Sequence, residues 1–195
     1  MRAKNGKSSA PGTKNSQRGF SLVEVLVSSV VLTVGLVALL GVFALALATT
    51  QSAQEDMVAK QLASEAWESI IVARQTTELT WASVQNQSAP GGQGIFLDGF
   101  QPILNAGANG VVGTTDDTGA RYLTLPGKDG IIGTSDDITL PLTNYQRKIE
   151  IDQVNDTAGN LIPDLRSVII TIQYSVPRSS VKKSYILTGY VSQYR

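Results

Sequence analysis

Cysteine and histidine are both absent from the 195 residues of this chain. No disulfide can therefore support the fold, and redox chemistry says nothing about the compartment. Histidine is the commonest general base and the commonest transition-metal ligand, so sites that depend on it are excluded. Serine and aspartate are plentiful, but no nucleophile–base pair and no phosphate-binding loop stands out. We predict that the protein is not an enzyme and has no certain cofactor.

Charged residues are missing from a long stretch, residues 25–54. An apolar run extends from Phe20 to Ala48, and about 20 apolar residues are enough to cross a bilayer. The run contains one carboxylate, Glu24, which we expect a little over one turn inside a helix. A carboxylate in the membrane costs about 2.5–3.5 kcal/mol on insertion scales, so Glu24 is a functional-site hypothesis. The alternative is a residue that snorkels near the interface.

An ordinary secretory signal is a competing interpretation of this run, since residues 44–48 offer small-x-small cleavage sites. The apolar core of such a signal is only about 7–15 residues long. The run here is longer, and Glu24 would fit poorly in that core. We therefore favour a membrane-spanning helix.

Acidic residues are missing from the first 19 positions, which carry five basic ones: Arg2, Lys4, Lys7, Lys14 and Arg18. The positive-inside rule places this end in the cytoplasm and the C-terminus outside. Without this leader the chain has 11 basic and 16 acidic residues. Phosphate binding needs a basic surface, so nucleic acid is not expected as the main partner.

Gly19, Phe20 and Glu24, placed directly after the basic leader, resemble the type IV prepilin family. The resemblance implies that a prepilin peptidase cuts between Gly19 and Phe20 and methylates the new amine. It also implies that the subunit packs into a filament through its apolar helix. Glu24, the fifth residue of the mature chain, would then pair with the N-terminal amine of a neighbouring subunit.

Residues 61–68 resemble the branch of minor pilins and type II secretion pseudopilins. Many major pilins carry a proline near the position of Gly41, and this chain does not. These two features favour a minor component. The resemblance implies other pilin or pseudopilin subunits and an inner-membrane assembly platform as partners. It places the chain in the bacterial inner membrane and then in an extracellular pilus or a periplasmic pseudopilus, and the sequence does not choose between these.

The expected fold is α+β and pilin-like, with a long N-terminal helix packed on a C-terminal antiparallel β-sheet head. An apolar stripe between Val58 and Ile71 recurs at helical spacing, and three β-rich segments follow later in the chain. We divide the chain into six parts: residues 1–19 as a cytoplasmic leader that is removed, 20–50 as a transmembrane and filament-core helix, 51–75 as the amphipathic half of the same helix, 76–106 as a connecting loop, 107–142 as a β-insertion, and 143–195 as an antiparallel sheet.

The insertion contains a degenerate repeat with a period of 20 residues, at positions 107–117 and 127–137. Asn-Gly and Asp-Gly signal tight hairpin turns, which is one interpretation. The other is calcium, which takes hard oxygen ligands, although the spacing does not match the EF-hand loop. The candidate ligands are Asn109, Asp116, Asp117, Asp129, Asp136 and Asp137. An alternative function follows: a membrane-anchored, calcium-binding adhesive surface protein that uses the helix only as a tether.

Overall fold

The computed structural model describes residues 19–176 and 181–194. The predicted leader therefore lies, apart from Gly19, outside the described residues. The chain divides into two compact units, residues 1–46 and residues 47–195. The helix α1 (Leu22–Gln75) contributes to both.

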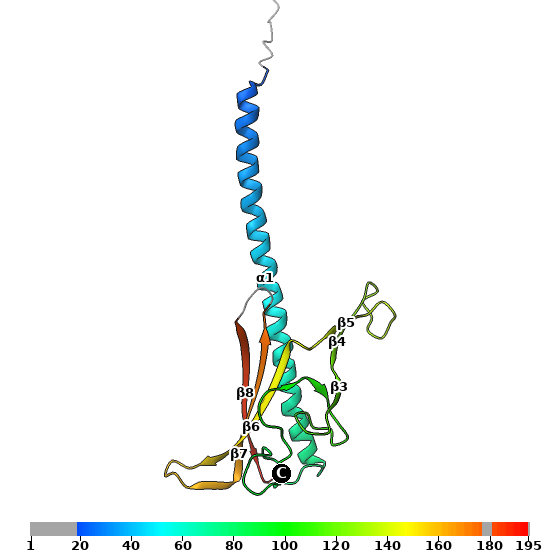
Figure 1. The fold of residues 1–195 in the computed structure, drawn as a ribbon, viewed down its shortest axis with the longest axis vertical. Helices are drawn as coiled ribbons and strands as arrows, with labels where there is room; N and C mark the ends of the chain where they lie inside the picture. The colour runs from blue at the N-terminus through cyan, green and yellow to red at the C-terminus, as the bar shows by residue number, and fades with distance from the viewer. Residues whose placement is uncertain (1–18, 177–180, 195) are drawn as a thin grey trace, which may run out of the picture. The chain divides into compact units, whose positions relative to one another are not determined.

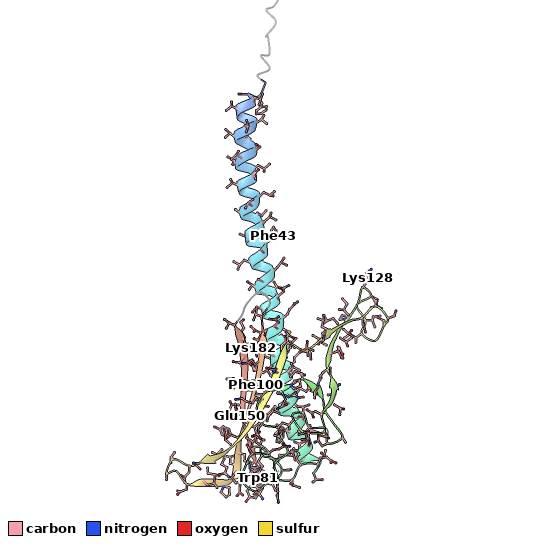
Figure 2. The ribbon with its side chains drawn as sticks, viewed as in Figure 1. Phe43, Trp81, Phe100, Lys128, Glu150 and Lys182 are labelled. Atoms are coloured by element: carbon pink, nitrogen blue, oxygen red, sulfur yellow. The ribbon has the colours of Figure 1, made fainter. Side chains whose placement is uncertain are left out.

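The first unit consists, in its described part, of the start of α1 and the three residues before it. Every residue from 22 to 46 is exposed, and Figure 2 shows side chains radiating on all sides around Phe43. Within the described residues, α1 is the one helix long and apolar enough to cross a membrane, with a mean hydropathy of 2.8 over its most apolar window. An all-round apolar surface is what a lipid-facing or filament-core helix requires.

In the second unit, α1 buries one stripe of its surface. The stripe predicted from the spacing of apolar residues is present, and it extends two residues further, to Ala73. The buried residues recur every three or four positions, which places them on one face of the helix. They are Ala59, Leu62, Ala63, Ala66, Ile70 and Ala73.

A four-stranded antiparallel sheet packs against this stripe, with strand order β1-β6-β7-β8. Its long strands are β6 (Tyr145–Asn155), β7 (Leu161–Ser175) and β8 (Lys182–Ser192), and the short β1 (Gln101–Pro102) pairs with β6. The expected meander is thus present. The two-residue strand at its edge comes from the segment predicted only as a connection. The α+β, pilin-like fold class is confirmed.

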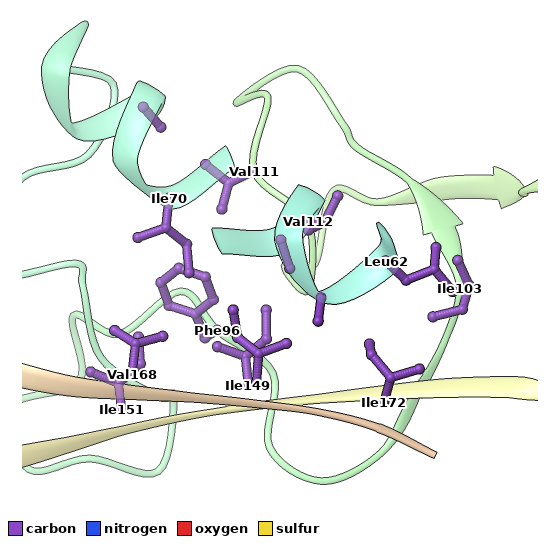
Figure 3. Packing of buried hydrophobic residues seen from close by; sticks show 14 of the residues in the cluster. Leu62, Ile70, Phe96, Ile103, Val111, Val112, Ile149, Ile151, Val168 and Ile172 are labelled. Carbon is purple, nitrogen blue, oxygen red and sulfur yellow. The ribbon is translucent and has the colours of Figure 1, made fainter. Parts of the chain in front are cut away.

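Sheet and helix share one apolar core (Figure 3). Ile149, Val168 and Ile172 of the sheet are almost fully buried together with Ile70 of α1. Gly189 on β8 lies so close to Trp67 of α1 that a Cβ atom there would clash with the indole ring. The sheet therefore covers the helical stripe around Trp67, as expected from its period.

Two small hairpins complete the second unit. One is β2 (Leu104–Asn105) paired with β3 (Thr118–Ala120), and the other is β4 (Tyr122–Leu125) paired with β5 (Ile138–Pro141). Each hairpin encloses one copy of the repeat. We name residues 106–117 loop I and residues 126–137 loop II. Strands β4 and β5 carry loop II away from the rest of the unit (Figure 1).

Candidate functional site

Gly19 and Phe20 lie just before the helix and are both exposed. Within the described residues, and leaving out its chain neighbours, no atom lies within 4 Å of the position that a Cβ atom would take on Gly19. Phe20 is 82% exposed, so the peptide bond between the two residues is open to approach. This geometry suits a protease substrate, and the processing role of the two residues stays a prediction.

Glu24 lies in the first turn of α1. Our expectation that it lies more than one turn inside the helix was wrong, because the helix begins at Leu22 and not at Phe20. Ser21 occupies the N-cap position, and its carbonyl oxygen accepts the first intrahelical hydrogen bond from the Val25 amide at 3.2 Å. A carboxylate in the first turn is stabilised by the helix dipole, by about 0.3–1 kcal/mol.

Ser21 is a residue that the sequence interpretation missed. Ser21 and Glu24 form the Ser-x-x-Glu pattern that precedes an apolar run in a capping box. This signal was available in the sequence and would have placed the helix start at Leu22.

The six candidate calcium ligands fall into two separate groups, one in each loop. In loop I, Asp116 Oδ2 accepts a hydrogen bond from the Asn109 amide at 3.1 Å. Asp116 Oδ1 accepts from the Thr114 hydroxyl at 2.6 Å and from Asn109 Nδ2 at 2.8 Å. Asp117 Oδ2 accepts from the Gly113 amide at 2.7 Å. The two carboxylates thus close the loop upon itself.

Loop II repeats most of these contacts. Asp136 accepts from the Lys128 amide at 2.6 Å and from the Thr134 hydroxyl at 2.7 Å. Asp137 Oδ2 accepts from the Gly133 amide at 2.6 Å, and Asp129 Oδ1 from the Ile131 amide at 2.9 Å. The repeat is therefore a 12-residue loop with its own hydrogen-bond pattern, and not the two-residue hairpin turn that Asn-Gly or Asp-Gly predicts.

These hydrogen bonds bear on the calcium prediction. No group of three or more acidic side chains is arranged to hold a metal ion in the part of the chain that the structure describes. In loop I, hydrogen-bond donors and the cation Arg147 already contact the carboxylates of Asp116 and Asp117. In loop II, Asp137 Oδ1 is shielded from solvent and has no hydrogen-bond partner. Calcium binding stays a prediction, and unfolding temperature measured against calcium concentration is its test.

The cation near loop I is Arg147 of β6, which is 2% exposed. Its Nη2 atom lies 3.9 Å from Asp117 Oδ2, while Nε and Nη1 have no hydrogen-bond partner. Burial lowers the pKa of Arg147 to about 10, and burial raises the pKa of Asp117 above its usual value. The sequence interpretation missed this residue. Strand period was the available signal, since Tyr145, Arg147 and Ile149 alternate onto the buried face.

The family comparison bears on the N-terminal residues. The model of the prokaryotic N-terminal methylation motif matches residues 14–40, which include Gly19, Phe20 and Glu24. The N-terminal segment of the chain therefore carries the motif of type IV prepilin-like proteins. No curated protein and no solved structure matches the chain.

The motif and the exposed apolar helix together indicate a type IV pilin-related, membrane-associated filament subunit. The motif also implies processing of the prepilin-like chain by a prepilin peptidase and assembly with other pilins. It indicates a structural protein rather than an enzyme.

Proposed function

We propose that the chain is a minor pilin or pseudopilin of a type IV pilus or a type II secretion-like filament. In this proposal it is cut between Gly19 and Phe20 and methylated on the new amine. The observation that carries the proposal is the methylation motif at the start of α1, where residues 22–46 are exposed and mostly apolar and one carboxylate lies in the first turn.

Electrostatics gives Glu24 its proposed role. Cleavage creates a positive charge on the Phe20 amine, at membrane depth and close to a lone carboxylate. In a low dielectric, opposite charges attract far more strongly than in water, and an unpaired buried charge is costly. Pairing of Glu24 with the amine of a neighbouring subunit therefore selects one register. Apolar contact alone would not select a register, because lipid is as apolar as the helix.

The proposed setting follows from the charge pattern. The N-terminus starts in the cytoplasm and the helix makes a single pass through the bacterial inner membrane. An inner-membrane platform assembles the processed subunits into an extracellular pilus or a periplasmic pseudopilus. The non-proline residue Gly41 and the run at residues 61–68 support a minor component.

Processing is tested at Gly19. Replacement by valine should block cleavage, because the open space at this glycine would be filled at the scissile bond. Mass spectrometry of the cellular protein should find wild type beginning at a methylated Phe20 and Gly19→Val retaining its leader. A wild-type chain that begins at Met1, or that is trimmed near Ala48, would overturn the proposal.

Register selection is tested at Glu24. Glu24→Gln keeps the side-chain size and removes the charge, so cleavage should continue while recovery of the subunit in sheared filaments drops. Ser21→Ala is the matched control, since it weakens the helix cap and leaves the carboxylate in place. Equal recovery of Glu24→Gln and wild type would contradict the pairing.

The tether hypothesis predicts a different result in the same experiment. A membrane-anchored adhesive protein needs no carboxylate at Glu24 and enters no filament. Wild-type protein that stays in the membrane fraction and is absent from sheared filaments would favour this alternative.

A further inference from the structure

The two loops contain equivalent pairs of apolar residues with opposite exposure. In loop I the pair is Val111 and Val112, which are 0% and 1% exposed in the core. In loop II the pair is Ile131 and Ile132, which are 61% and 65% exposed. Isoleucine is more apolar than valine, so exposing Ile131 and Ile132 to water costs more free energy than exposing Val111 and Val112 would. Exposed apolar surface of this kind is gained as binding free energy when a partner covers it.

Loop I shows what such a pair does when it has a partner. Figure 3 shows Val111 and Val112 beside the ribbon of α1, with Val111 close to Ile70. The Val112 amide also donates to Ser69 Oγ at 3.5 Å. The loop thus inserts its apolar pair against a helix of its own subunit. Loop II has the same shape and no such surface within reach, because β4 and β5 hold it away from the body (Figure 1).

The same unit also has an apolar groove of about 550 Å³ between α1 and the β4–β5 hairpin. Met57 and Val58 line its helical side, and Leu123, Leu125 and Leu140 line its strand side. Met57 is 63% exposed, so the groove is open. It therefore offers a helix flanked by apolar strand residues, which is the kind of surface that loop I occupies within its own subunit.

Charge complements this apolar match. Glu55 lines the groove, and its Oε2 atom is shielded from solvent without a hydrogen-bond partner. Burial raises the pKa of Glu55, and the charge of Lys183 offsets this increase only in part. Lys128 is exposed at the tip of loop II, three residues before Ile131 (Figure 2). Loop II therefore carries a cation next to its exposed apolar pair.

We propose that Ile131 and Ile132 of one subunit dock into the groove lined by Met57 and Leu140 of a second copy, with Lys128 facing Glu55. This inference deepens the proposed function and rests on it, because it makes copies of this chain adjacent in the filament. Loop tip and groove are different surfaces, so the contact is heterologous.

Disulfide cross-linking tests the contact on a clean background, since the chain contains no cysteine. Two differently tagged full-length copies are produced in the cells that build the filament, one with Ile131→Cys and one with Met57→Cys. After oxidation we expect a dimer that carries both tags. The control pairs Met57→Cys with Ile186→Cys, because Ile186 on β8 is 58% exposed and apolar but lies outside loop II. Equal yields from the two pairs would overturn the proposal.

Charge reversal sharpens the result. Lys128→Glu should reduce the yield of the Ile131→Cys pair by about tenfold, because it opposes two like charges in a buried contact. Adding Glu55→Lys to the other copy should restore the yield. A Lys128→Glu effect without this restoration would overturn the assignment of Glu55.

The remaining outcomes separate this inference from the proposed function. Protein recovered in sheared filaments without the link between positions 131 and 57 keeps the proposed function and overturns the contact. A link from the Ile131→Cys copy to a different protein overturns the choice of a second copy. The Ile131→Cys thiol could also be protected from a water-soluble maleimide by membranes alone, without a link to another protein. That result would mean that loop II contacts lipid and not a second copy. A link between copies that never enter filaments would uphold the contact and overturn the proposed function.

Discussion

Loops I and II have nearly the same sequence pattern and nearly the same internal hydrogen bonds, yet one lies in the core and the other in solvent. In both, the first aspartate of the Asp-Asp pair accepts a threonine hydroxyl, and the second accepts a glycine amide. In loop I the apolar pair is buried, while in loop II it is exposed. Local sequence therefore determines the shape of the loop, and its surroundings determine its role.

The second aspartate of the pair has different contacts in the two loops. Asp117 of loop I faces the buried guanidinium of Arg147, whereas Asp137 of loop II has a shielded oxygen without a hydrogen-bond partner. The same residue is half of a buried ion pair in one copy and a loop-closing acceptor in the other. Substitutions at matched positions should separate the two roles.

The largest difference in stability is expected between substitutions of Asp117 and Asp137, the second aspartates of the two loops. Asp117→Ala leaves the Arg147 charge buried and uncompensated, so it should lower the free energy of unfolding by about 3–5 kcal/mol. Asp137→Ala removes one acceptor and should cost no more than about 1 kcal/mol. Urea unfolding of the full-length chain in detergent measures both, followed by the fluorescence of Trp67 and Trp81. Similar losses of unfolding free energy in the two variants would show that the ion pair between Asp117 and Arg147 adds no stability.

The next effect concerns the apolar pairs. Val112→Ala removes buried methyl groups and leaves a small cavity, which should cost about 2 kcal/mol. Ile132→Ala changes an exposed residue and should stay within about 0.5 kcal/mol of wild type. The same urea unfolding measurement compares the stability of the two variants. A loss at Ile132 as large as at Val112 would mean that loop II is packed within its own subunit.

A smaller difference is expected at the first glycine of each repeat. A Cβ atom on Gly107 would clash with the backbone oxygen of Asp116, and one on Gly127 with that of Asp136. Both loops must then shift, but only loop I transmits its shift to the core. Gly107→Ala should cost about 1 kcal/mol, the lower end of what overpacking costs in a core. Gly127→Ala should leave the unfolding midpoint nearly unchanged, and an equal shift in both variants would contradict this.

The smallest effect is a matched change in titration. The hydrogen bond from Thr114 is the largest cause that lowers the pKa of Asp116, and the bond from Thr134 does the same for Asp136. An aspartate whose pKa is lowered on folding stabilises the fold above its unfolded value of about 3.9. That stability is lost as the pH falls through the lower folded value. Thr114→Val and Thr134→Val should each raise the pKa of the neighbouring aspartate, as carboxyl-carbon NMR measures.

A stability difference should separate the two threonine variants in the same titration. Thr114 is 2% exposed and its loop packs on the core, so acid unfolding should begin at a higher pH in Thr114→Val than in wild type. Thr134→Val should unfold as wild type does, since the apolar pair of loop II is exposed and does not join the core. Identical acid unfolding of the two variants would remove the distinction between the loops.

Much of the fold could be predicted from local pattern. The helical stripe around Leu62 and Trp67, the β-rich segments and the apolar run with Glu24 each follow from a period or a length within one segment. The helix start was predicted two residues early because the cap at Ser21 was not recognised. The edge strand β1 could not be predicted, because two residues carry no period and their pairing with Gln146 and Arg147 depends on the folded sheet.

The sequence by itself determined the N-terminal motif, the apolar first part of α1, the apolar stripe on its second part, the meander and the internal hydrogen bonds of both loops. Each of these depends on residues close together in the chain. Only the tertiary structure decided which loop is buried, that Arg147 lies under Asp117, and that a groove forms between α1 and the β4–β5 hairpin. These features join segments far apart in sequence. Their physical cause is burial, since the free energy of an apolar or charged side chain depends on what surrounds it in space.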